Sequence, residues 1–236
     1  MRFTVITLFP EIFEGFLGSA LIAKAIDKKL IQIDLLNLRD FAEPPHYKVD
    51  DTPYGGGAGM VLAPLPLARA IQAAQKSENG DDTKVVLLSA AGKLFNQETA
   101  GEFATEKRII LVCGRYEGVD QRIIDLYVDY EISLGDFVTM GGEAPALCLI
   151  EACARLVPGV LGNQQSLINE SFSAKKGKRR LLEAPHYTKP AKFVDLPVPE
   201  VLLSGNHQAI EDWRAQASQS KTLLNRPDLL RNIVER

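Results

Sequence analysis

Two stretches of this chain place glycines beside charged and aromatic side chains, directly after apolar segments. Residues 109–113 (IILVC) lead into 114–118 (GRYEG), and residues 130–134 lead into 135–143 (GDFVTMGGE). Glycine lacks a Cβ, so the backbone can approach a ligand closely there. Ligands bind at the carboxyl ends of strands in parallel α/β sheets. Either stretch alone is more typical of an ordinary turn, but their recurrence favours the walls of a small-molecule pocket.

The elements that would position these loops alternate along the chain. Hydrophobic periodicity predicts strands at about 1–9, 31–36, 84–88, 109–113 and 130–134, and helices at about 11–29, 66–75, 97–106 and 144–157. This order is typical of a parallel sheet with helices on its faces. The strand at 84–88 ends in Ser-Ala-Ala-Gly, which we interpret as a third turn of small residues at the same edge. We therefore predict an α/β fold with a mostly parallel sheet and helices on both faces.

A glycine-rich segment interrupts this pattern between the second and third predicted strands. Gly55, Gly56, Gly57 and Gly59 lie within five positions, flanked by Asp50, Asp51 and Tyr54. Regular structure is costly there, because each glycine loses much conformational freedom on folding. The segment is either a flexible linker or a loop shaped around a ligand. Its polar flanks and the immediate return to apolar residues favour the shaped loop.

Composition excludes several classes of protein. The chain has 236 residues, 46% of them hydrophobic and 24% charged, and no apolar run approaches the ~18 residues of a membrane span. We therefore expect no membrane association. The three cysteines are odd in number and in no paired motif, which indicates a reducing, cytoplasmic location. No spacing of His and Cys indicates a metal site. The nucleotide-binding motifs G-x-G-x-x-G and G-x-x-x-x-G-K-[ST] are absent.

Charge is distributed unevenly along the chain. Residues 1–160 carry 15 Lys/Arg and 22 Asp/Glu, whereas residues 161–236 carry 12 Lys/Arg and 8 Asp/Glu. A basic C-terminal part indicates either a polyanion partner or a solvated basic face. We predict three parts: a main domain at 1–160, a flexible basic linker at 161–185, and a small helical domain at 186–236. Helices are expected there at 210–218 and 227–235.

Six ordered motifs together resemble one family, the bacterial tRNA (guanine-N1)-methyltransferases of the knotted (SPOUT) superfamily. The motifs are 50–60 (DDTPYGGGAGM), 111–118 (LVCGRYEG), 135–137 with 141–143 (GDF and GGE), 158–162 (PGVLG), 185–190 (PHYTKP) and 202–207 (LLSGNH). The chain departs from the family pattern at Ala90, where proline is common, and at Met140, where a small hydroxyl residue is usual. The match is in register from about residue 9 to residue 230. The resemblance implies transfer of a methyl group from S-adenosylmethionine to N1 of guanosine 37, beside the tRNA anticodon, which supports maintenance of the reading frame. It also implies a deep trefoil knot, and a homodimer with active sites at the subunit interface.

The resemblance assigns roles to particular residues. It implies that the methyl donor is bound by Leu87, Leu88, Ser89, Gly114, Tyr116, Glu117, Ser133, Leu134, Gly135, Thr139, Gly141 and Gly142. Arg155 matches the catalytic arginine. Glu170 stands where the family has its general base, an aspartate before Ser-Phe, and keeps the carboxylate with one more methylene. Taken alone, Arg155 is typical of a cation near a helix C-terminus, and Glu170 of a solvent-exposed residue.

Contacts with the anticodon stem-loop of tRNA are implied for the glycine loop and for the basic C-terminal part. The residues concerned are Tyr54, Gly55, Gly56, Gly57, Gly59, Lys175, Lys176, Lys178, Arg179, Arg180, His186, Lys189 and Arg214. Family activity depends on magnesium, for which the sequence offers no dedicated cage. Three other readings remain open: a knotted methyltransferase with a different RNA target, a non-catalytic RNA- or ribosome-binding protein with a vestigial pocket, and a nucleotide-binding α/β enzyme of unrelated chemistry.

Overall fold

The computed structural model describes residues 1–76, 83–163, 167, 170–173 and 180–230. They divide into two compact units, Met1–Gly162 and Asn163–Arg236. The first unit contains β1 (Arg2–Thr7), η1 (Pro10–Phe13), α1 (Glu14–Leu17), α2 (Ala20–Asp27), β2 (Gln32–Asn37), η2 (Leu38–Phe41), β3 (Asp50–Asp51), β4 (Val61–Leu62), α3 (Pro64–Lys76), β5 (Thr83–Leu94), α4 (Gln97–Ala104), β6 (Arg108–Cys113), α5 (Gln121–Tyr127), β7 (Tyr130–Ser133) and α6 (Glu143–Ala154). The second contains β8 (Lys192–Phe193), β9 (Leu196–Pro197), α7 (Glu200–Leu203), α8 (His207–Asn225) and η4 (Pro227–Leu230).

The first unit is built on a five-stranded sheet with the order β2-β1-β6-β5-β7. Every neighbouring pair in it is parallel, so the predicted parallel sheet is confirmed. All six residues of β6 are buried, as expected for a central strand covered on both faces. Strands β5, β6 and β7 lie side by side, and their carboxyl ends therefore meet at one edge.

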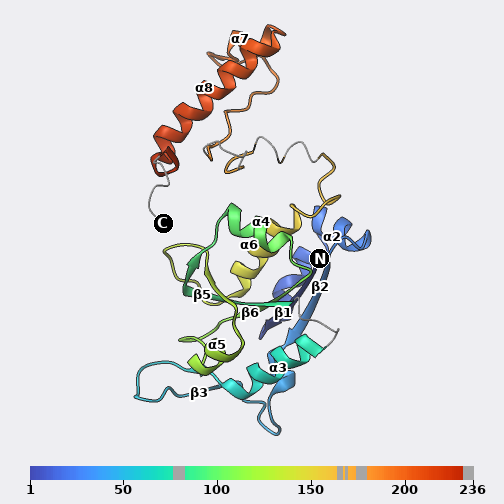
Figure 1. The fold of residues 1–236 in the computed structure, drawn as a ribbon, viewed down its shortest axis with the longest axis vertical. Helices are drawn as coiled ribbons and strands as arrows, with labels where there is room; N and C mark the ends of the chain where they lie inside the picture. The colour runs from blue at the N-terminus through green and yellow to red at the C-terminus, as the bar shows by residue number, and fades with distance from the viewer. Residues whose placement is uncertain (77–82, 164–166, 168–169, 174–179, 231–236) are drawn as a thin grey trace. The chain divides into compact units, whose positions relative to one another are not determined.

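Helices cover both faces of this sheet, as predicted. Alternate residues of β6 point to opposite faces. Ile109 and Leu111 pack in a cluster with residues of α4 and α6, while Ile110 and Val112 pack in a cluster with residues of α3 and α5. Figure 1 shows α4 and α6 on one side of the strands and α3 and α5 on the other. The strand ends are thus held between two apolar layers.

The prediction of one continuous helix at 11–29 is wrong. The segment forms η1, α1 and α2, with a break at Gly18 and Ser19. Gly18 ends α1, and Ser19 is extended with φ −106° and ψ 139° before α2 begins. Ala20 has a φ of 48°, in the left-handed region. Apolar spacing continues through the break, so periodicity alone hides it.

Strand β5 does not end at Leu88, contrary to the prediction. It continues to Leu94 after an irregularity between Leu88 and Lys93, both of which pair with Ile132 of β7. A Cβ on Gly92 would lie 2.4 Å from the backbone nitrogen of Ile132. Glycine is therefore required where the irregular segment passes against β7, and residues 89–91 are displaced from regular pairing.

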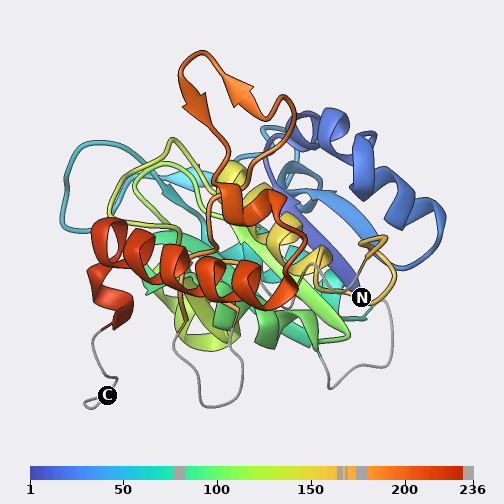
Figure 2. The same ribbon diagram turned by 90° about the horizontal axis from the view of Figure 1, so that it is seen from above.

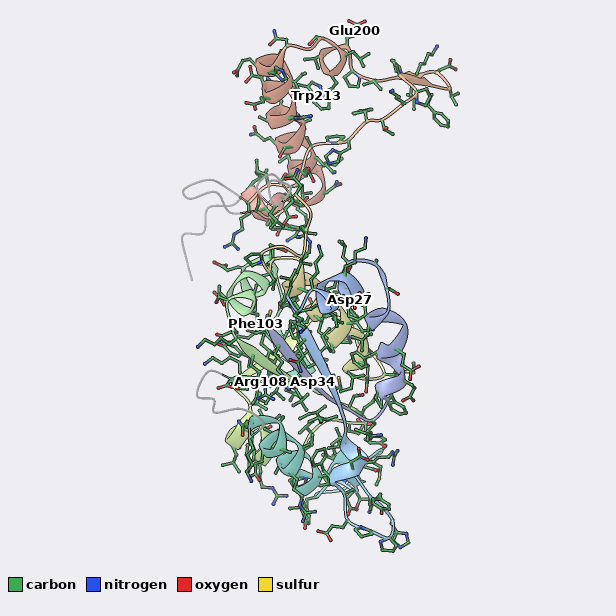
Figure 3. All side chains as sticks on the ribbon, turned by 90° about the vertical axis from the view of Figure 1, so that its right-hand side faces the viewer. Asp27, Asp34, Phe103, Arg108, Glu200 and Trp213 are labelled. Atoms are coloured by element: carbon green, nitrogen blue, oxygen red, sulfur yellow. The ribbon has the colours of Figure 1, made fainter. Side chains whose placement is uncertain are left out.

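The second unit is organised around the 19-residue helix α8, which is longer than the predicted 210–218. The ring of Tyr187 packs edge-to-face against that of Trp213 on α8, with centroids 6.2 Å apart. Figure 3 labels Trp213 on this helix. The backbone N–H of Leu182 donates to Thr222 Oγ1 at 2.9 Å. Figure 2 shows the β8–β9 hairpin projecting away from α8. A helix was predicted at 227–235. The 3-10 helix η4 covers 227–230, and residues 231–235 lie outside the described chain.

Among the described residues, no helix is both long and apolar enough to cross a membrane. The trefoil knot and the three-part division at 160 and 185 stay predictions. Residues on both sides of Arg180 nevertheless contact each other within the second unit. Phe172 donates its backbone N–H to the carbonyl of Leu181 at 3.0 Å, and Glu183 donates its own to Ser171 Oγ at 3.0 Å.

Candidate functional site

A cavity of about 430 Å³ lies at the carboxyl ends of β5, β6 and β7. This is the position at which parallel α/β sheets bind ligands. Eleven of the twelve residues predicted to bind the methyl donor line it: Leu87, Leu88, Ser89, Gly114, Tyr116, Glu117, Ser133, Leu134, Thr139, Gly141 and Gly142. Gly135 lies in the same loop as Leu134 but does not border the cavity. Segments far apart in the sequence are therefore brought together as the glycine pattern indicated.

The first glycine loop leaves β6 with a strained backbone. Tyr116 has a φ of 60°, which is uncommon for any residue with a side chain. The loop is tied to the glycine-rich segment, because Glu117 donates its backbone N–H to the Met60 carbonyl at 3.0 Å. A Cβ on Gly59 would lie 2.5 Å from Glu117 Oε1. Gly59 therefore leaves the space that the Glu117 side chain occupies beside the cavity.

The second glycine loop follows β7 and returns to the end of β6. Gly142 donates its backbone N–H to the Gly114 carbonyl at 2.8 Å, and Thr139 Oγ1 donates to the Gly141 carbonyl at 2.9 Å. A Cβ on Gly142 would lie 2.7 Å from Cys113 Cα and 2.9 Å from the Gly114 nitrogen. Two backbone segments thus touch at this point, which only glycine permits.

Sequence reasoning did not assign a role to the buried charge pair below these loops. Glu143 Oε1 accepts from Thr7 Oγ1 at 2.8 Å, and Glu143 Oε2 accepts from Arg115 Nε at 2.8 Å. Arg115 Nη1 also donates to the Met140 carbonyl at 3.2 Å. Two features of the sequence could have indicated this ion pair. A glutamate follows Gly141-Gly142 directly at the start of a predicted helix, and the first glycine loop contains a single arginine, Arg115.

The thiol of Cys113, at the end of β6, is free and buried. Burial raises the pKa of Cys113 well above its usual value, and the negative charge of Glu143 raises it further. A protonated, buried thiol is a poor nucleophile. The cavity therefore offers positioning groups, and this cysteine does not supply covalent chemistry.

The two predicted catalytic residues lie outside the lining of this cavity. Arg155 is the C-cap residue of α6, whose first residue is Glu143. Because a helix rises 1.5 Å per residue, the twelve residues of α6 separate its two ends by roughly 18 Å. Glu170 belongs to the second unit, next to Ser171 and Phe172. Within one copy of the first unit, Arg155 thus lies at the far end of the helix that begins at the cavity.

The predicted tRNA-binding residues fall in both units. Tyr54 is fully exposed at the tip of the glycine loop, whose glycines are also exposed. His186, Lys189 and Arg214 are exposed in the second unit, and Arg180 is half-buried there. Lys175, Lys176, Lys178 and Arg179 lie outside the described residues.

No group of three or more His, Cys, Asp or Glu side chains is placed to hold a metal ion in the described part of the chain. Asp51, beside the glycine-rich segment, pairs with Lys48 at 3.0 Å. The hydrogen bond from Lys48 lowers the pKa of the Asp51 carboxyl. This carboxylate already has a cationic partner.

Comparison with known proteins agrees with the geometry. The family model described as "tRNA (Guanine-1)-methyltransferase TrmD" matches residues 1–232. A tRNA (guanine-N(1)-)-methyltransferase of Desulfatibacillum aliphaticivorans is 50% identical over 98% of this chain and 85% of its own length. One of Clostridioides difficile (strain 630) is 46% identical over the whole of both chains. One of Dictyoglomus turgidum is 47% identical over 98% of this chain and 90% of its own. The chain therefore belongs to the tRNA (guanine-1)-methyltransferase family of enzymes.

Proposed function

We propose that this enzyme transfers a methyl group from S-adenosylmethionine to N1 of guanosine 37 in tRNA. The observation that carries the proposal is the cavity at three adjacent parallel strand ends, lined by eleven of the twelve residues that the family pattern assigns to the donor. Such a site in a chain of this family favours catalysis over a vestigial pocket. Maintenance of the reading frame, a cytoplasmic location and a knotted chain are parts of the same proposal.

The cavity fits a methyl donor of this kind. Its volume of about 430 Å³ falls in the range of about 300–1,000 Å³ that is usual for small-ligand sites. Gly114, Gly141 and Gly142 present backbone groups to it, and Glu117 and Ser133 add polar side chains. Backbone groups would hold the adenine, and Glu117 would lie near the methionine end. When bound, the donor supplies a methyl group that its sulfonium makes electrophilic.

The remaining chemistry concerns one proton and one developing charge. Guanine N1 is protonated at neutral pH and must lose its proton before it can attack. The Glu170 carboxylate would accept this proton, a role worth ~10² to 10⁴ in rate. The Arg155 guanidinium would stabilise the negative charge that develops on guanine O6. The other task of the protein is to hold the methyl carbon and N1 in line.

A homodimer would complete the site. Arg155 lies roughly 18 Å from the cavity end of α6 in its own copy, which is too far for one side chain to span. A second copy packed across this helix could bring its own Arg155 to the cavity. The distance along α6 therefore supports active sites at a subunit interface.

Binding of tRNA would use the exposed glycine loop and the basic second unit. The target base must leave its stack, which costs a few kcal/mol. Phosphate contacts from Arg180, Lys189 and Arg214, together with the basic run at 175–180, would offset that cost and make binding salt-dependent. Aromatic Tyr54, which is fully exposed, could stack on a base.

The family resemblance also implies that the methyl-transfer activity depends on magnesium. The described residues do not form a three-ligand cluster, so no step is assigned to a protein-bound metal ion. A magnesium ion held by the tRNA or by a single carboxylate remains compatible with the residues present.

The proposal is tested by methyl transfer from labelled S-adenosylmethionine to two tRNA transcripts, one with guanosine and one with adenosine at position 37. Transfer to the first transcript alone supports the proposal. Equal transfer to both indicates a different target. Binding of tRNA without any transfer indicates a non-catalytic RNA-binding protein.

A further inference from the structure

Glu143 is a buried carboxylate at the N-terminus of α6, only 2% exposed. Its two oxygens have one hydrogen-bond donor each, Thr7 from the end of β1 and Arg115 from the first glycine loop. A buried charge is costly unless it is paired and hydrogen-bonded. The Glu143 carboxylate is therefore bound by partners from two different strand ends.

Arg115 connects this carboxylate to the cavity. Its side chain is 19% exposed, and the residue lines the cavity. Its guanidinium carbon lies 4.4 Å from the centre of the Phe9 ring, and Phe9 donates its backbone N–H to Thr7 Oγ1 at 3.0 Å. Thr7, Phe9, Arg115 and Glu143 thus form a closed network around one buried ion pair.

The same network anchors one wall of the cavity. Arg115 donates to the Met140 carbonyl, and a Cβ on Gly141 would lie 2.2 Å from Arg115 Nε. The wall around these residues is otherwise open to solvent, because the residues Val138 and Met140 are 87% and 91% exposed. The Arg115 side chain therefore helps to hold this wall, together with the hydrogen bond from the Gly142 N–H to the Gly114 carbonyl.

The Arg115–Glu143 ion pair also affects the charge that a bound ligand meets. An S-adenosylmethionine sulfonium carries a positive charge, whereas the thioether of the product S-adenosylhomocysteine is neutral. An unpaired guanidinium in the lining would repel the donor but not the product. In the low effective dielectric of a pocket, two like charges about 10 Å apart interact strongly enough to change affinity about tenfold.

We propose that Glu143 is a specificity-determining residue, which cancels the charge of Arg115 so that the cavity accepts the cationic donor as readily as the neutral product. Arg115 and Thr7 are positioning residues in this scheme, since they hold Glu143 and the wall at Met140. The identity of the two ligands rests on the proposed function. The pairing itself rests on the distances and burial.

The experiment is calorimetric titration of the full-length chain with each compound separately. Glu143→Gln leaves Arg115 uncompensated, so we expect the affinity for S-adenosylmethionine to fall about tenfold more than that for S-adenosylhomocysteine. In the double variant Arg115→Gln/Glu143→Gln the pair is neutral, and the ratio of the two affinities should return to that of the wild type. A purely structural role would weaken both ligands equally in both variants.

Controls separate the possible failures. Glu43→Gln makes the same change in an exposed pair, Arg69–Glu43 at 2.6 Å, and should leave the ratio unchanged. If Glu143→Gln does not fold, Arg115→Gln tests the opposite sign, because the carboxylate of Glu143 then lacks its cationic partner and should favour the cationic donor over the neutral product. An unchanged ratio in a folded variant would overturn the inference. A wild-type chain that binds neither compound would instead contradict the proposed function.

Discussion

At the scale of single residues, the proposed chemistry needs two side chains that the cavity lining does not contain. Glu170 lies in a segment that is held within the second unit by Phe172, two residues further on. Phe172 donates its backbone N–H to the Leu181 carbonyl, and the guanidinium carbon of Arg226 lies 5.7 Å from the centre of its ring. Arg155 caps α6. Both Glu170 and Arg155 also contribute to local structure. A catalytic role can therefore be distinguished from a structural one only with variants that keep the structural contribution.

Replacing Glu170 by Gln should remove the proton acceptor while keeping the shape of the side chain. We expect turnover to fall by about 10²- to 10⁴-fold, with the affinity for the methyl donor unchanged. Glu170→Asp keeps a carboxylate and should retain turnover. Single-turnover kinetics and donor titration measure both quantities. The matched control is Glu200→Gln on α7, an exposed glutamate of the same unit, and turnover in Glu170→Gln equal to that control would remove Glu170 from the mechanism.

Arg155→Lys distinguishes a catalytic role from stabilisation of the helix. Lysine keeps a positive charge at the C-terminus of α6, so the favourable interaction with the helix dipole is preserved. An ammonium cannot reproduce the planar guanidinium fork. We expect the melting temperature to stay unchanged while kcat falls by about 10²- to 10³-fold, as when an oxyanion-stabilising donor is lost. Unchanged kcat would assign Arg155 a structural role in place of the catalytic one.

At the scale of elements, the site depends on close contact between backbone segments. The two glycine loops touch at Gly142, where a Cβ would lie 2.7 Å from Cys113 Cα. Backbone atoms in two anchored loops cannot move aside as a flexible side chain would. The contact between the loops is therefore a sensitive point of the cavity.

Gly142→Ala should destabilise the protein by about 1–3 kcal/mol through overpacking and should weaken donor binding. The control is Gly101→Ala in α4, where a Cβ would meet nothing within 4 Å. An alanine within a helix should stabilise the protein by about 0.5–1 kcal/mol. Denaturant unfolding and donor titration of both variants check this. Equal stability of the two variants would show that the loops can separate without cost.

The sequence predicted the order and type of most elements of the first unit because periodicity and strand-end glycines are local signals. The break at Gly18 and the irregular part of β5 escaped it, since apolar spacing runs through the first and pairing with β7 creates the second. The residues expected to bind the donor were assigned through the family pattern, and eleven of these twelve line the cavity. The link from Thr7 to Glu143 spans 136 residues, and no local pattern can indicate such a contact.

At the scale of the whole molecule, the account requires two copies of the chain. The cavity lies at one end of α6 and Arg155 at the other. If a second copy supplies Arg155, a variant that lacks the arginine and a variant that lacks the cavity should complement each other. If both groups act within one copy, no mixture can restore a complete site.

Co-expression of Arg155→Lys with Gly142→Ala tests this arrangement. Random pairing makes half of the dimers mixed, and each mixed dimer has one intact site, so we expect turnover to recover to about a quarter of the wild-type value. Each variant alone supplies the baseline. Turnover of the mixture equal to the average of the two baselines would contradict shared active sites.

The most direct measurement of the central claim is identification of the methylated nucleoside after reaction with an unmodified tRNA. The tRNA is incubated with the enzyme and S-adenosylmethionine, then digested and analysed by mass spectrometry, and the modified position is mapped on the intact strand. The account predicts N1-methylguanosine at position 37. A different methylated nucleoside, a different position, or no methylation by a chain that binds the donor would contradict it.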